Sequence, residues 1–179
     1  YSDGNLDYCG IVFDSRALTI YRGFISFDLS DAGWTSSSTI SSATLSVRGR
    51  TYSSADVIAV ESDAFTTSAA SVFDNDTTTA YSSQKSTWST SGYNTITLNS
   101  TAINDLLNNS NFYVCIKEHD FDYSRSSICR YEELEVVTGW DASRVNSVKL
   151  EVTYTTPSGY TETVTGISAA NMDKINGIS

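Results

Sequence analysis

The sequence predicts an all-β fold, specifically an antiparallel β-sandwich of jelly-roll type with one short helix and a short helical C-terminal tail. In three stretches, 25–29, 43–47 and 148–154, apolar residues occupy every second position, and this alternation is typical of strands with one buried face. Serine and threonine make up more than a quarter of the chain, which has one proline and 12% aromatic residues. Such a composition suits strands whose other face is wet.

The length of 179 residues is enough for one sizeable core and short for two. We therefore expect one β-sandwich domain, residues 1–156, followed by a linker and a C-terminal attachment segment, residues 157–179. No apolar run approaches the roughly 20 residues that a membrane-spanning helix needs. The chain begins at Tyr1 without a signal peptide, so we expect a processed product or a fragment.

A polar turn enters the first strand, 11–13, and the loop between the next two strands, 21–30 and 40–47, is too long for a two-residue hairpin turn. These two strands could therefore pair with each other or lie in facing sheets. Residues 63–92 are expected to be mostly loop. Further strands are expected at 56–62, 93–98, 111–118 and 148–154.

A helix of about two turns is expected at 100–108, because Ser100 or Thr101 can cap its start and apolar residues recur at 103, 106 and 107. In the strand after it, Phe112, Val114 and Ile116 share one face and Cys115 points to the other. The strand at 148–154 is expected to close the sandwich.

The charge of the chain is −10, with an isoelectric point near 4.3. Phosphate binding needs a cationic face that releases counterions, so this charge argues against nucleic acid as a partner. An extracellular or virion-surface location fits an acidic, Ser/Thr-rich chain better.

The three cysteines, Cys9, Cys115 and Cys129, allow at most one disulfide. Cys115 and Cys129 flank a loop centred near Asp122, and antiparallel strands leaving that loop would bring the two cysteines opposite each other. We therefore predict a disulfide between Cys115 and Cys129, with Cys9 as the spare thiol.

An acidic loop offers the best oxygen ligands for a cation. Glu118, Asp120 and Asp122 alternate along it, and Glu132 or Glu133 could assist. Hard cations need several oxygens converging from adjacent segments, so calcium is possible here although no cofactor is required. The alternative calcium position is formed by Asp3, Asn5 and Asp7 near the N-terminus.

Catalytic chemistry has little support in the sequence. His119 is the single histidine, no G-x-S-x-G motif is present, and no C-x-x-C pair could anchor zinc. Acidic clusters could supply the carboxylate pair of a glycosidase, but such clusters more often form a solvated rim. We therefore expect a protein that is not an enzyme. Trp34, Trp88 and Tyr123 are candidates for stacking against sugars, with core or loop anchoring as the ordinary alternative.

The C-terminal stretch predicts a short helix with Ser168 as its N-cap and Gly177 just past its end. A helix this short is marginal alone. Its apolar side chains therefore need a surface, and we expect them to make an intersubunit contact. These side chains are Ile167, Met172, Ile175 and Ile178.

Two strings carry a resemblance to known proteins. Residues 22–30, Arg-Gly-Phe-Ile-Ser-Phe-Asp-Leu-Ser, followed by Thr-Ile-Ser-Ser-Ala-Thr-Leu at 39–45, resemble the core of DNRLRE-type domains. These are β-sandwich modules similar to carbohydrate-binding modules, found in bacterial secreted proteins and phage structural proteins. The C-terminal Gly-Ile-Ser repeat is similar to terminal repeats of phage virion proteins.

These resemblances imply two functions of different class. The first is a structural subunit or module of a phage virion or an extracellular surface fibre, with copies of itself or other virion or fibre subunits as partners. The alternative is a carbohydrate-binding module of a larger secreted protein, with surface glycans as partners.

Overall fold

The structure is a computed structural model. It describes residues 6–14, 17–52, 56–62, 78–89, 91–124, 134–141, 148–157 and 161–168. The strands are β1 (Leu6–Asp14), β2 (Ala17–Tyr21), β3 (Gly23–Asp28), β4 (Thr39–Tyr52), β5 (Val57–Glu61), β6 (Tyr93–Thr97), β7 (Asn111–Glu118), β8 (Leu134–Asp141), β9 (Val148–Thr155) and β10 (Thr161–Ser168). The helical elements are α1 (Ser100–Asn108) and a π-helical turn, η1 (His119–Tyr123). The predicted all-β character is confirmed. None of the helices in this part of the chain could span a membrane.

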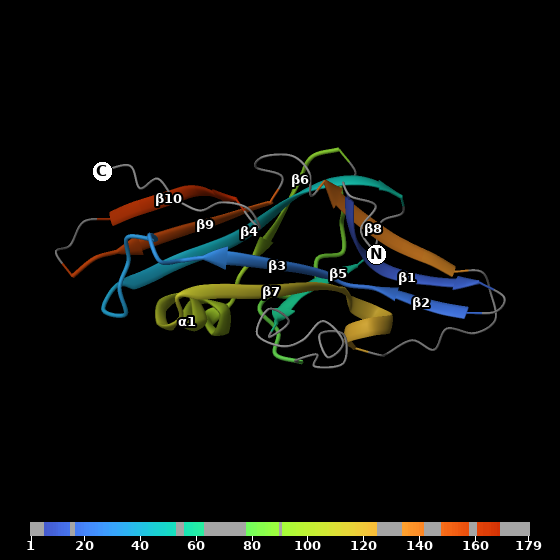
Figure 1. The fold of residues 1–179 in the computed structure, drawn as a ribbon, viewed down its shortest axis with the longest axis horizontal. Helices are drawn as coiled ribbons and strands as arrows, with labels where there is room; N and C mark the ends of the chain where they lie inside the picture. Colours follow the sequence, from blue (N-terminus) through green and yellow to red (C-terminus); the bar gives the residue numbers. More distant parts are fainter. Residues whose placement is uncertain are drawn as a thin grey trace.

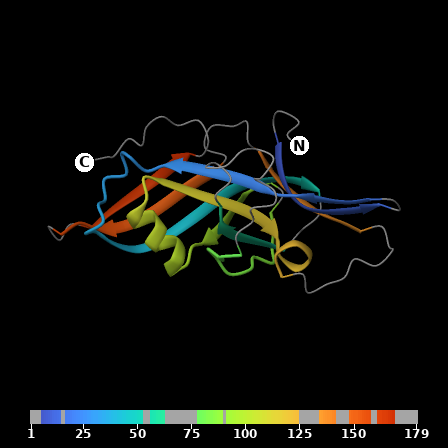
Figure 2. The same cartoon turned by 60° about the horizontal axis from the view of Figure 1, so that its bottom comes forward.

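The strands form two antiparallel sheets (Figure 1). The larger sheet has the order β10-β9-β4-β8-β1-β2, with β6 also paired to β4, and the smaller sheet has the order β3-β7-β5. In two views the β1–β2 hairpin extends from one end of the molecule, while α1 lies towards the other end (Figure 2). The long strand β4 organises the larger sheet, because β9 pairs with its residues 39–47 and β8 with residues 49–52.

The stretch expected as one strand over 21–30 is two strands in different sheets. β2 ends at Tyr21 in the larger sheet and β3 begins at Gly23 in the smaller one, so Arg22 marks the point where the chain changes sheets. Of the two arrangements left open for the segments 23–28 and 40–47, the structure has them in separate sheets.

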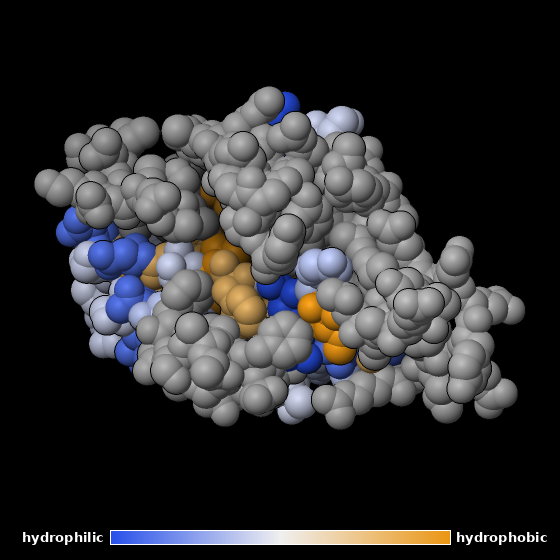
Figure 3. Space-filling model, turned by 45° about the vertical axis from the view of Figure 1, so that its right-hand side comes forward, coloured by the Kyte–Doolittle hydropathy of each residue, from blue (hydrophilic) through white to orange (hydrophobic). Residues whose placement is uncertain are grey.

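One hydrophobic core joins the two sheets, and it forms from the alternating positions that the sequence indicated. On β3 and β7 the inward residues include Phe27 and Phe112, whose rings stack 6.3 Å apart. On β4 and β9 they include Leu45 and Leu150, which are directly opposite each other in the ladder. The outward positions of β9 and of β4 from Thr44 to Arg48 are polar, and Ser46 of β4 forms a hydrogen bond of 3.1 Å with Thr95 of β6. The face shown in Figure 3 likewise has hydrophobic patches directly beside hydrophilic ones.

Helix α1 forms where it was expected, but its cap is one residue earlier. The side-chain oxygen of Asn99 accepts hydrogen bonds from the backbone N–H groups of Thr101 and Ala102, at 3.0 and 3.1 Å. Asn99 also donates to the carbonyl of Ala80 at 2.7 Å, which ties the start of the helix to the neighbouring segment. Asparagine suits this position because its short side chain reaches the exposed amides of the first turn.

Three strands were not expected from the sequence: β2, of which only Tyr21 lies in a predicted strand, β8 and β10. No strand was predicted in the segment 134–141 that forms β8. β10 pairs with β9 over a segment expected to be linker, and the register shifts between Val164 and Ile167. This irregularity breaks the two-residue alternation, and a β-bulge of that kind hides a strand from pattern analysis. Ser168, expected to cap a helix, is the last residue of β10; the rest of the expected tail helix lies outside the described residues.

Candidate functional site

The acidic loop predicted to bind a cation forms a tight corner at the end of β7. Glu118 is 1% exposed, and its carboxylate accepts hydrogen bonds from the backbone N–H groups of the three residues in the centre of η1. The distances are 2.9 Å from Asp120, 2.6 Å from Phe121 and 3.3 Å from Asp122. Burial raises the pKa of Glu118, and these three N–H groups act in the opposite direction. Glu118 therefore serves as the cap of the turn.

Asp122 is held by Arg22, 100 residues earlier in the chain. The guanidinium donates from Nε at 2.8 Å and from Nη2 at 2.6 Å, one to each carboxylate oxygen. Both side chains are buried, with exposed fractions of 7% for Arg22 and 2% for Asp122. A two-point Arg–carboxylate pair fixes direction as well as distance. Because Arg22 is where the chain changes sheets, this ion pair fastens the sheet-to-sheet crossing to η1.

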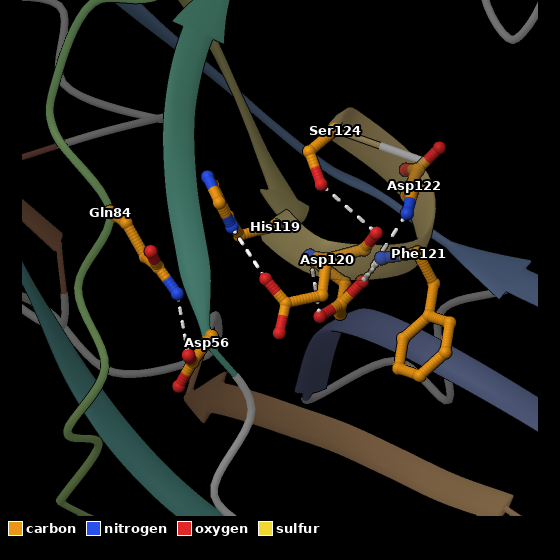
Figure 4. Close-up of polar contacts among 8 residues, drawn as sticks. Asp56, Gln84, His119, Asp120, Phe121, Asp122 and Ser124 are labelled. Carbon is orange, nitrogen blue, oxygen red and sulfur yellow. Dashed lines mark hydrogen bonds and ion pairs between the residues drawn. The ribbon is translucent and has the colours of Figure 1, made fainter. Parts of the chain in front are cut away.

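The outer side of the corner has its own contacts (Figure 4). The ring of His119 meets the carboxylate of Asp120 at 2.7 Å through Nδ1, and Ser124 donates to the carbonyl of Asp120 at 3.1 Å. Gln84 donates to the carboxylate of Asp56 at 2.6 Å. The backbone of Asp56 in turn accepts from the N–H of His119 at 2.7 Å, so the start of β5 is tied to η1.

The three predicted cation ligands are thus near one another in the chain but directed to different donors. Glu118 accepts from backbone amides, Asp120 contacts His119, and Asp122 pairs with Arg22. Within the described residues, no group of three or more His, Cys, Asp or Glu side chains converges as a metal site would require. The alternative ligands Asp3, Asn5 and Asp7, and the assisting Glu132 and Glu133, lie outside the described residues.

Cys115 is buried on the outer side of β7, opposite to the core-facing Val114 and Ile116, as the alternation predicted. It packs with Ile58 and Val60 of β5 in a small cluster, and its Sγ donates a long hydrogen bond of 3.8 Å to the carbonyl of Ile116. Cys129 lies outside the described residues, so its disulfide with Cys115 stays a prediction.

The aromatic residues proposed as sugar platforms are anchors of the fold. Trp88 is 7% exposed and belongs to the main core, so the expectation that it stacks on a sugar is wrong. Trp34 is half-buried at the edge of that core, donates to the carbonyl of Leu106 at 2.9 Å and packs edge-on against Tyr154. Tyr123 packs on the small cluster that contains Cys115, and its hydroxyl donates to the carbonyl of Thr78 at 3.2 Å.

A groove that the sequence analysis missed lies where α1 passes into β7, beside the end of β5. Its volume is about 330 Å³. The lining residues are Glu61, Ser62, Tyr81, Asp105, Asn109, Ser110, Asn111, Phe112 and Tyr113. The sequence signal was the polar run from 108 to 111, Asn-Asn-Ser-Asn, where the predicted helix 100–108 meets the predicted strand 111–118. Each asparagine side chain offers one hydrogen-bond acceptor and two donors, so a run of asparagines also provides groups that can bind a polar ligand.

The floor of this groove is rigid. Tyr81 is 2% exposed, and its ring stacks on Phe112 with 5.2 Å between centroids. The Tyr81 hydroxyl donates a short hydrogen bond of 2.5 Å to the carboxylate of Asp105. Burial raises the pKa of Tyr81 well above its ordinary value, and the hydrogen bond to Asp105 adds to the shift. The hydroxyl therefore stays protonated and orients one oxygen of Asp105.

Of the predicted assembly residues, the structure describes the backbone of Ile167, which is opposite Leu150 in the β9–β10 ladder. Met172, Ile175 and Ile178 lie outside the described residues.

No family model, curated protein or solved structure matches the chain.

Proposed function

We propose that the chain is a non-enzymatic structural module with β-sandwich architecture, displayed on a phage virion or an extracellular surface fibre and attached through its C-terminal segment. The main support for this proposal is that the side chains of the acidic corner, Glu118 to Ser124, stabilise the fold. Its carboxylates cap a turn and pair with a buried arginine, and the ring of His119 contacts Asp120. The residue types that could have performed chemistry thus contribute to the fold. The module needs no cofactor for such a role.

The position of β10 supports attachment through the C-terminal segment. Among the described strands of the larger sheet, β10 stands last in the order, beside β9, and it ends at Ser168. An edge strand offers backbone groups that a neighbouring chain can pair with. The sequence that follows contains Met172, Ile175 and Ile178, whose burial against another subunit would favour assembly by about 1.5–3 kcal/mol for each side chain.

Truncation tests this proposal. Because β10 ends at Ser168, a chain ending there keeps every described strand, whereas a cut at Gly166 would remove part of β10. We expect the full chain to sediment as an oligomer, and the chain ending at Ser168 to be a folded monomer with the same far-ultraviolet circular dichroism. The matched control replaces residues 169–179 by a Gly-Ser segment of equal length. If either shortened or replaced chain assembles like the full chain, the segment is not the attachment point.

The second candidate is a carbohydrate-binding module, with surface glycans as partners. The observation that favours it is the polar groove at the α1–β7 junction, because it combines amide and carboxylate side chains with tyrosines. The two candidates are compatible, since a displayed module can also bind a glycan. An extracellular or virion-surface location is part of both proposals.

A further inference from the structure

We propose that the groove at the α1–β7 junction is a binding site for a neutral saccharide, held through paired hydroxyl groups by Asp105, Asn109 and Asn111. The inference rests on the second candidate function above and specifies its site and ligand class. It does not depend on the C-terminal attachment. This groove is separate from the aromatic residues that the sequence suggested for sugar stacking. The sequence analysis named none of its three polar residues as a site residue.

Two of the three polar side chains, those of Asp105 and Asn109, are held by hydrogen bonds of the fold. Asp105 is held by the Tyr81 hydroxyl, and Asn109 ends α1 with both its backbone N–H and its side-chain Nδ2 donating to the carbonyl of Asp105, at 3.1 Å each. Asn111 begins β7, and its register is set by pairing with Asp28. Groups that are positioned before the ligand arrives lose little freedom on binding.

These side chains keep unused hydrogen-bonding capacity. Within the described part of the chain, the second carboxylate oxygen of Asp105 and the side-chain oxygens of Asn109 and Asn111 accept no hydrogen bond. Carboxylate and amide groups are planar and carry two acceptor or donor–acceptor sites. They can therefore engage two neighbouring hydroxyls of one sugar ring. Tyr113 also lines the groove and provides aromatic surface for the C–H face of the ring.

The charge of the groove excludes other ligand classes. The described residues of the lining include the carboxylate of Asp105 and no lysine, arginine or histidine, so a phosphate, sulfate or carboxylate would find no cationic partner among them. Among the described residues, no three His, Cys, Asp or Glu side chains converge in the groove as a metal site would require. A purely apolar ligand would leave the buried part of the polar lining without partners. A neutral polyhydroxyl compound satisfies the lining without these costs, and about 330 Å³ is the size of a small-ligand site.

The test uses the full chain, labelled and applied to an array of neutral and charged glycans, followed by calorimetric titration of the strongest neutral saccharide. The double variant Asn109→Ala/Asn111→Ala should weaken binding about tenfold or more, as expected for the loss of two hydrogen-bonding groups. The matched control is Asn104→Ala/Asn108→Ala, which removes two exposed asparagines of α1 that do not line the groove. It should change the affinity less than about twofold, and thermal melting of both variants should match the parent.

Each other result overturns the inference in a distinguishable way. If no neutral saccharide binds the full chain, both the groove assignment and the carbohydrate-binding function are wrong, and the structural role is unaffected. If a saccharide binds equally to the parent and to Asn109→Ala/Asn111→Ala, the function stands and the groove is not its site. If the array shows only acidic or amino sugars, the assigned ligand class is wrong.

Discussion

The ion pair between Arg22 and Asp122 should be among the most sensitive points of the fold. Removing one partner leaves the other charge buried, because the two side chains are only 7% and 2% exposed and are joined by hydrogen bonds of 2.8 and 2.6 Å. Breaking a buried pair in this way typically costs about 3–5 kcal/mol. We therefore expect Arg22→Ala to lower the free energy of unfolding by that amount, which is a large part of the stability of an ordinary domain.

The measurement is urea unfolding followed by tryptophan fluorescence, with Arg48→Ala as the control. Arg48 is half-buried on β4 and makes no ion pair with a described residue, so its removal should cost less than about 1 kcal/mol. The double variant Arg22→Met/Asp122→Leu should regain most of the stability lost in Arg22→Ala, since no unpaired charge remains. A loss below about 1 kcal/mol for Arg22→Ala, or no recovery in the double variant, would refute the role assigned to this pair.

Three further variants test separate parts of the fold. Asn99→Ala should lower the free energy of unfolding by about 1–2 kcal/mol, because it removes the cap of α1 and the bond to Ala80; urea unfolding measures this, and a neutral result would show that the cap is dispensable. Gly49→Ala should cost about 3 kcal/mol, because the added Cβ would lie 1.8 Å from the carbonyl oxygen of Ser89; Ser46→Ala on the same strand is the control, and equal melting temperatures would contradict the close approach. Burial raises the pKa of Glu118 in the folded chain above its ordinary value of 4.5, so the folded chain binds the carboxyl proton more tightly than the unfolded chain does. The folded chain therefore loses stability as the pH rises from the unfolded-state pKa through the folded-state pKa. The stability of Glu118→Gln relative to the parent should therefore increase as the pH rises above about 4.5, and a difference that is flat or of opposite sign would show that burial does not dominate this carboxyl group.

The sequence was sufficient for the elements whose alternation is regular. The inward residues of β3, β7 and β9, and those of β4 from Ala43 to Val47, follow a period of two, and the structure buries them in one core. The sequence was insufficient where a local irregularity interrupts the period, as at the bulge of β10, or where one residue divides two strands, as at Arg22. Neither event changes composition, so neither is visible without tertiary pairing.

The sequence was likewise insufficient to predict the contacts within the candidate sites. The sequence located the acidic corner correctly as a polar cluster, because Glu118, Asp120 and Asp122 are close in the chain. It could not show that Arg22, 100 residues away, would neutralise Asp122. The groove was missed for the same reason, because its lining comes from β5, α1, β7 and the segment around Tyr81. Contacts between distant segments decide whether a polar residue serves the fold or is available to a ligand.

The proposed structural role depends most directly on the acidic corner being part of the fold and not a cation site. The decisive measurement is the melting temperature of the full chain in EDTA and in about 1 mM calcium, for the parent and for Asp120→Asn. A cation bound with a dissociation constant of about 10 μM would stabilise the folded chain by about 2.7 kcal/mol at that concentration. We predict that calcium produces no stabilisation that depends on Asp120. A melting temperature that calcium raises in the parent but not in Asp120→Asn would contradict the account.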